Sequence, residues 1–201
     1  MSSVIPLTKL DAVNLILADI GDRPVNTLAT TNRLDVTRAV DTLDSVVRQL
    51  CTLGWWFCEE AVDVVVDNSG HYNIPNDWTK VSYTSGGPTT GVRGAPQYTV
   101  RGRRLYDVVN ATDTFDATSP TINLSISRLL EFEDLPQAAR EYAYATASVT
   151  MQSRTLGSRQ VDGDLRLRAA QALVTLKTEE VDVSVEDTTY SPRFIELMHR
   201  R

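Results

Sequence analysis

The chain has 201 residues, of which 42% are hydrophobic and 23% are charged, as expected for a compact globular protein that builds its core without disulfides or metals. Its formal net charge of -6 argues against a protein held on nucleic acid by a cationic face, although DNA can pass such a surface without being retained. No apolar run approaches the roughly 20 residues that cross a bilayer, and the N-terminus lacks a secretory signal pattern, so we expect no membrane anchor.

Two helices are predicted in the N-terminal third. Thr8 followed by Asp11 resembles a capping box and opens a helix near 9–20. A longer helix is expected near 32–53, because its apolar residues recur at steps of four and three on one face. These residues are Val36, Val40, Leu43, Val47 and Leu50. Gly54 can end this helix in a left-handed conformation, after which three aromatic residues offer an apolar plug. They are Trp55, Trp56 and Phe57.

Beyond these aromatic residues the apolar period shortens to two, which predicts strands. Residues 62–67 alternate and run into a turn at 68–70, so we expect residues 71–74 to return as the hairpin partner. Further strands are expected at 78–84, 98–100, 105–109 and 121–130. Together they predict an inserted antiparallel β-domain of residues 58–132.

Helical periodicity returns after the strands and predicts helices near 135–155 and 162–180. The expected fold class is therefore α+β. A four-helix body of residues 1–57 and 133–181 surrounds the inserted β-domain, and residues 182–201 form a C-terminal arm.

Few residues suggest chemistry. His71 and His199 are the only histidines, and neither stands in a pattern typical of a catalytic triad. Cys51 and Cys58 are the only cysteines, and two such residues make neither a zinc site nor a disulfide framework, so we expect buried free thiols. We assign no catalytic, cofactor-binding or metal-binding residue and expect no cofactor.

Three blocks, in this order and spacing, resemble the tail tubular protein A family of T7-like bacteriophages. The first is Ala-Val-Asn-Leu-Ile-Leu-Ala-Asp-Ile-Gly at residues 12–21. The second is the long helix that ends in Gly-Trp-Trp-Phe at residues 54–57. The third spans residues 126–148, where Leu-Pro opens a helix bearing alanine and tyrosine. The resemblance covers the helical frame over almost the whole length.

The resemblance implies a structural virion protein rather than an enzyme. Members of this family act as the head-to-tail adaptor, or gatekeeper: a dodecameric ring lies between the portal protein and the tail nozzle protein, tail tubular protein B, and lets DNA pass during ejection. The resemblance also implies tail fibre attachment near this junction. It implies a location in the virion tail, after synthesis in the cytoplasm of the host bacterium.

Two segments are candidates for docking to partners. In the arm, the apolar candidates are Tyr190, Phe194, Ile195, Leu197 and Met198. The alternative for the arm is an ordinary helix packed on its own subunit. A glycine- and proline-rich loop at 85–96 and a basic hairpin tip at 101–104 supply further candidate contacts. These are Arg93, Arg101, Arg103 and Arg104. The tip could contact DNA or an acidic partner, and the alternative is an ordinary charged surface turn.

Two other functions stay open. A carbohydrate-binding or carbohydrate-cleaving tail protein is conceivable through four aromatic residues of the expected β-domain, Tyr72, Trp78, Tyr83 and Tyr98. Aromatic rings exposed beside an acidic pair would favour this function, and burial of the rings would argue against it. The other alternative is a regulatory protein that binds a host factor as a small oligomer.

Overall fold

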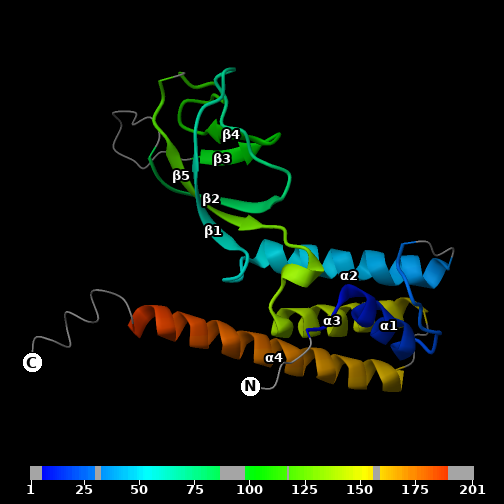
Figure 1. The fold of residues 1–201 in the computed structure, drawn as a ribbon. Helices are drawn as coiled ribbons and strands as arrows, with labels where there is room; N and C mark the ends of the chain where they lie inside the picture. The colour runs from blue at the N-terminus through cyan, green and yellow to red at the C-terminus, as the bar shows by residue number, and fades with distance from the viewer. Residues whose placement is uncertain (1–5, 30–32, 87–97, 117, 156–158, 190–201) are drawn as a thin grey trace, which may run out of the picture. The chain divides into compact units, whose positions relative to one another are not determined.

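The computed structural model describes residues 6–29, 33–86, 98–116, 118–155 and 159–189 (Figure 1). The helices are α1 (Lys9–Asp19), α2 (Leu34–Leu53), α3 (Gln137–Thr155) and α4 (Arg159–Thr189), with a short 3-10 turn at Phe132–Asp134. The strands are β1 (Glu59–Val64), β2 (Trp78–Gly86), β3 (Tyr98–Arg101), β4 (Arg104–Asp107) and β5 (Ile122–Arg128). The expected α+β class, with four helices and small antiparallel sheets, is confirmed.

The chain divides into two compact units. The helical unit comprises residues 1–47 and 131–201, and the β unit comprises residues 48–130. The β unit therefore starts inside α2 and includes its last turns, whereas the periodicity of the sequence suggests a boundary at residue 58, after the helix.

Local hydrogen bonds fix both ends of α1. The predicted capping box is present: Asp11 N donates to Thr8 Oγ1 at 3.2 Å, and Thr8 N donates to Asp11 Oδ2 at 3.3 Å. After the helix, the Asn14 side chain exchanges two hydrogen bonds, of 2.9 and 2.8 Å, with the backbone of Val25. The loop that follows α1 is thereby tied back to the helix.

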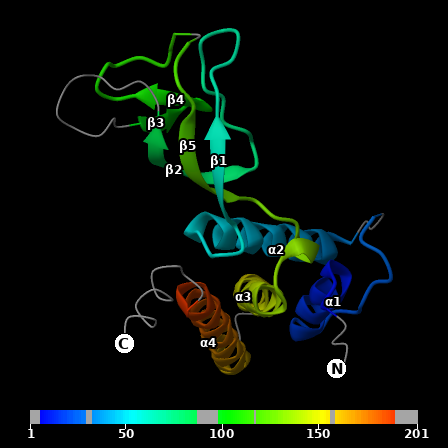
Figure 2. The ribbon, with the colours of Figure 1, turned by 60° about the vertical axis from the view of Figure 1, so that its left-hand side comes forward.

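In the helical unit, α3 lies between α1 and α4 and contacts both (Figure 2). Its buried face is dominated by alanine, whose small side chain permits close approach of neighbouring helices. The buried alanines are Ala138, Ala139, Ala143, Ala145 and Ala147. The ammonium group of Lys9 in α1 also lies 2.7 Å from the carboxylate of Asp44 in α2.

The long helix α2 buries the predicted stripe and ends as expected. Val36, Leu43, Val47 and Leu50 are buried, and Val40 is half-buried. Gly54 follows the last turn with a φ of 80°, a left-handed conformation that glycine adopts without steric cost. The rings of Trp55 and Phe57 then stack with their centroids 6.5 Å apart.

The β unit is built around β5, the middle strand of a three-stranded antiparallel sheet in the order β1–β5–β2. Leu124 lies opposite Val62 in β1 and Tyr83 in β2. The strands β3 and β4 form a separate hairpin, and the core lies among these elements. The buried core residues are Val64, Tyr72, Ile74, Leu105, Phe115, Ile122, Leu124 and Ile126.

Two expectations about the elements are wrong. Residues 71–74 are not the hairpin partner of β1, which pairs with β5; within 71–74 only Asn73 forms an isolated bridge, to Arg104. The last helix does not stop near residue 180 but continues to Thr189, so residues 182–189 of the expected arm are helical. No glycine or proline interrupts the chain between Gly163 and Pro192, which leaves the helix free to continue.

Two glycine-to-alanine substitutions should shift stability in opposite directions. Gly54→Ala forces alanine into the left-handed region and should lower the free energy of unfolding by about 1–2 kcal/mol. Gly163→Ala, in α4 with open space around it, should raise that free energy by about 0.5–1 kcal/mol. Urea unfolding followed by circular dichroism measures both, and a Gly54→Ala variant as stable as the native chain would contradict this account of the end of α2.

Candidate interaction site on the β3–β4 hairpin

The β3–β4 hairpin carries the predicted basic tip on a two-residue turn. Gly102 and Arg103 both have positive φ, of 54° and 66°, as in the tight turns whose twist matches that of antiparallel strands. The Arg103 guanidinium folds back and donates to the backbone carbonyls of Ile74, at 3.2 Å, and Pro75. The turn is therefore braced against the segment that precedes β2.

The other two arginines of the tip also have intramolecular contacts. The guanidinium carbon of Arg101 lies over the Tyr106 ring, 3.7 Å from its centroid, an arrangement that favours cation–π attraction. Arg104 lies 3.4 Å from the carboxylate of Asp113. All three arginine side chains remain exposed. These contacts fix the positions of the arginine side chains. The tip can therefore bind an acidic partner without first ordering them.

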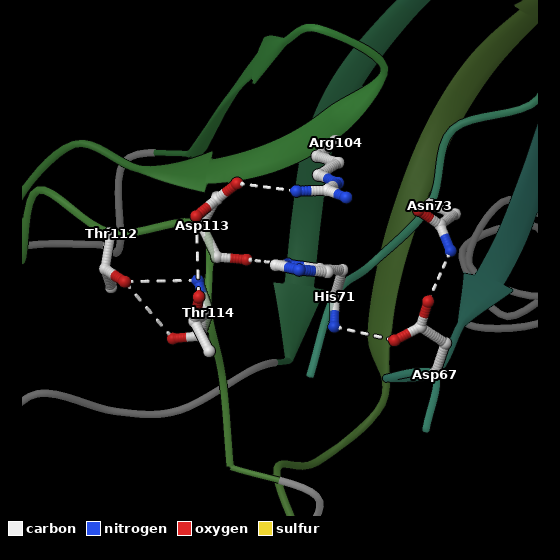
Figure 3. A network of polar contacts seen from close by, with 7 residues as sticks. All are labelled: Asp67, His71, Asn73, Arg104, Thr112, Asp113 and Thr114. Carbon is white, nitrogen blue, oxygen red and sulfur yellow. Dashed lines mark hydrogen bonds and ion pairs between the residues drawn. The ribbon is translucent and has the colours of Figure 1, made fainter. Parts of the chain in front are cut away.

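A polar network holds the loops behind this hairpin (Figure 3). The Asp67 carboxylate accepts hydrogen bonds from His71 N at 2.9 Å and from Asn73 Nδ2 at 2.6 Å. His71 Nδ1 lies 2.8 Å from the backbone carbonyl of Asp113, and since a carbonyl only accepts, this nitrogen carries the proton. Asp113 in turn pairs with Arg104. His71 therefore links two loops.

The same bonds shift the ionisation of Asp67. The backbone hydrogen bond from His71 is the main cause that holds the pKa of Asp67 below its usual range, with further donation from Ser69 and Asn73. The ionised carboxylate is thus the form that fits the loop.

A hollow of about 300 Å³ adjoins the hairpin. It is lined by Ile74, Trp78, Thr79, Val81, Tyr98, Thr99, Val100 and Arg103. Trp78 Nε1 and the Tyr98 hydroxyl are shielded from solvent and have no hydrogen-bond partner among the described residues. Burial is the main cause that raises the pKa of Tyr98 to about 12, so its hydroxyl stays protonated. The lining mixes apolar side chains with the polar Thr79, Thr99 and Arg103, so the hollow can accept a side chain of a protein partner that is itself partly polar.

The four aromatic residues considered for carbohydrate binding are largely used by the core. Tyr72 is fully buried and its hydroxyl donates to the Pro120 carbonyl at 2.7 Å. Trp78, Tyr83 and Tyr98 are half-buried and pack against the core, and the rings of Tyr83 and Tyr98 lie 5.0 Å apart. Rings that pack on one another offer no open stacking platform, which argues against the carbohydrate function.

Other sequence candidates fall into two groups. Cys51 and Cys58 are buried free thiols, as expected; hydrogen bonding with Cys58 lowers the pKa of Cys51 to about 7 and raises that of Cys58. Within the described residues, no group of three or more His, Cys, Asp or Glu side chains could hold a metal ion. Arg93 and all five apolar arm candidates lie outside the described residues.

Comparison with known protein families identifies the family of this chain. The family model described as tail tubular protein matches residues 10–185, which span both units. The chain belongs to the tail tubular protein family. Membership supports a structural role in the bacteriophage tail and a location in the virion tail. No curated protein sequence matches this family member significantly, and none of its described helices is both long and apolar enough to cross a membrane.

Sequence reasoning found the basic tip of this tail tubular protein but missed the hollow beside it. The tip is visible as three arginines around one glycine in a short window. The lining of the hollow comes from β2, β3 and the segments before β2 and after β3, which only the fold brings together. The sequence signal for the hollow was a pair of aromatic residues, Trp78 and Tyr98, on either side of a glycine- and proline-rich stretch.

Replacing Asp67 by asparagine should lower the melting temperature at neutral pH, because the neutral amide accepts these hydrogen bonds less strongly. A depressed pKa stabilises the fold above the unfolded value of about 3.8, and this stabilisation is lost as the pH falls through the folded pKa. The difference between Asp67→Asn and the native chain should therefore shrink below pH 3.8.

Thermal melts followed by tryptophan fluorescence across pH measure this effect. Asp116→Asn is the matched control, since among the described residues the Asp116 carboxylate accepts only longer bonds, of 3.3 and 3.4 Å, from Thr118. A deficit of Asp67→Asn that persisted unchanged at low pH would contradict the role of the ionised carboxylate.

Proposed function

We propose that this tail tubular protein is a ring-forming head-to-tail adaptor that joins the portal to the tail nozzle and lets genomic DNA pass. The observation that carries the proposal is the family match across residues 10–185, together with the resemblance of three sequence blocks to the tail tubular protein A family. The helical blocks of that resemblance form α1, α2 and α3.

A structural rather than catalytic role is consistent with the way polar side chains are used. His71, Asp67 and Asp113 hold loops together, and the aromatic residues build the core. Groups that serve in catalysis need access to a substrate, whereas these are occupied by one another.

A ring requires heterologous contacts between copies, in which one surface meets a different surface of the next copy and the rotation closes. We propose twelve copies, as the resemblance implies. The net charge of -6 supports passage of DNA, because a channel built from acidic subunits does not retain phosphates.

Two surfaces are proposed for the partners. The apolar arm residues dock on the portal protein, where burial of large apolar side chains supplies the affinity. The β3–β4 hairpin, with Arg101, Arg103 and Arg104 beside the hollow, meets an acidic surface of the nozzle protein or a tail fibre. Arg93 belongs to the same proposed contact.

Negative-stain imaging of the purified protein, alone and mixed with its portal ring, tests the adaptor function. We expect a ring of this protein stacked coaxially on the portal. A protein that stays monomeric and ignores the portal would contradict the proposal.

The arm contact has its own test. Phe194→Ala combined with Leu197→Ala should weaken binding to immobilised portal by at least about tenfold, because two large apolar side chains lose burial. Glu196→Ala, between them in sequence, is the matched control and should bind as the native chain does. Equal binding by all three proteins would show that the arm does not dock.

A further inference from the structure

The two cysteines of the chain contact each other in the interior of the β unit. Cys51 and Cys58 are both buried and both carry free thiols. The Cys58 thiol donates a hydrogen bond to the Cys51 sulfur, which also accepts one from the Leu130 amide. The two sulfur atoms are therefore neighbours, and neither is used by the candidate site on the β3–β4 hairpin.

Two tight turns of the backbone bring the cysteines together. Gly54 N donates to the Cys51 carbonyl at 3.3 Å, and Cys58 N donates to the Trp55 carbonyl at 2.8 Å. Between these turns the left-handed conformation of Gly54 reverses the chain. The chain thus leaves the last turn of α2 and returns to the Cys51 side chain just before β1 begins.

The end of β5 holds the backbone of both cysteines. The Ser127 hydroxyl donates to the Cys51 carbonyl, and Arg128 N donates to the Cys58 carbonyl at 2.8 Å. Since Ser127 and Arg128 are consecutive residues of one strand, they fix the two cysteines relative to each other. All of these residues belong to the β unit.

Two thiols in contact have a chemical property that a single buried thiol lacks. From hydrogen-bond contact, the sulfur atoms need to approach by only about 2 Å to reach the length of an S–S bond. The hydrogen bond from Cys58 also lowers the pKa of Cys51 to about 7, so the thiolate that attacks disulfides is present at neutral pH.

We propose that Cys51 and Cys58 form an intramolecular disulfide bond once the protein is in an oxidising environment. Disulfides persist at virion surfaces and are rare in the cytoplasm. A protein of the virion tail leaves the cytoplasm when the host cell releases the particle. The subunit therefore enters the tail with free thiols and acquires the bond afterwards. This inference does not depend on the adaptor function.

The oxidant is a small disulfide such as oxidised glutathione. When a local fluctuation exposes the pair, the Cys51 thiolate attacks one glutathione sulfur, and one reduced glutathione leaves. The Cys58 thiolate then attacks the Cys51 sulfur of this mixed disulfide, and the second reduced glutathione leaves. The two thiol protons end on the two glutathione molecules, so the protein loses two hydrogen atoms and one oxidised glutathione is reduced.

The bond closes a loop of residues 51–58 and joins the last turn of α2 to the residue before β1. Such a cross-link restricts the unfolded chain, which stabilises the folded state. It also fixes the two carbonyls that receive the hydrogen bonds from Ser127 and Arg128. The end of β5 is thereby held more firmly in the oxidised protein.

Intact-mass spectrometry of the native chain after incubation with oxidised glutathione tests the proposal. Remaining thiols are labelled with N-ethylmaleimide after denaturation. We expect a monomer that has lost two hydrogen atoms and carries neither label nor glutathione. Two labelled thiols, a lasting glutathione adduct or disulfide-linked dimers would overturn the inference.

A second measurement asks whether the bond fits the native fold. The melting temperature of the native chain should rise by at least about 5 °C on oxidation and fall back when a reductant is added. Cys51→Ser combined with Cys58→Ser is the matched control, since it cannot form the bond and should melt at one temperature under both conditions. A melting temperature that oxidation leaves unchanged or lowers would overturn the inference, and portal binding by the reduced protein would be unaffected.

Discussion

The β unit depends on the two hydrogen-bond ladders that β5 carries, one on each edge. Residues 122–128 pair with β1 on one side and β2 on the other, across separations of roughly 40 to 70 residues. Ile122, Leu124 and Ile126 point to the same face of the sheet and enter the core that also holds Leu105 of β4. The hairpin with its basic tip packs on that core. The shape of the candidate site therefore depends on the pairing of β5 with β1 and β2.

Local features of the fold could be predicted from the sequence, and non-local ones could not. The capping box of Thr8 and Asp11, and the stop at Gly54, depend on neighbours within four residues, and both are present. The turn after Asp67 is also present, but the strand expected behind it is absent, because β1 finds its partner 58 or more positions along the chain. A turn signal tells where the chain reverses, not which segment pairs.

The same distinction holds for the candidate site. Three arginines around a glycine identify a basic turn, but their partners Tyr106, Asp113 and the Pro75 carbonyl come from different segments. For α4, the sequence carries apolar residues on two faces, Leu165 and Leu176 on one and Leu167 and Val174 on the other. Only packing on α3 decides that the first pair is buried and the second exposed.

The two buried thiols can report local opening of the structure around them. Cys51 closes the last turn of α2 and Cys58 immediately precedes β1, so the two sulfur atoms mark the passage from helix to strand within the β unit. Alkylating reagents attack the thiolate, and a side chain that is 0 or 1% exposed reacts only when the surrounding structure opens. The rate of alkylation at these positions therefore reports how often the junction between helix and strand opens, in the native chain and without an engineered cysteine.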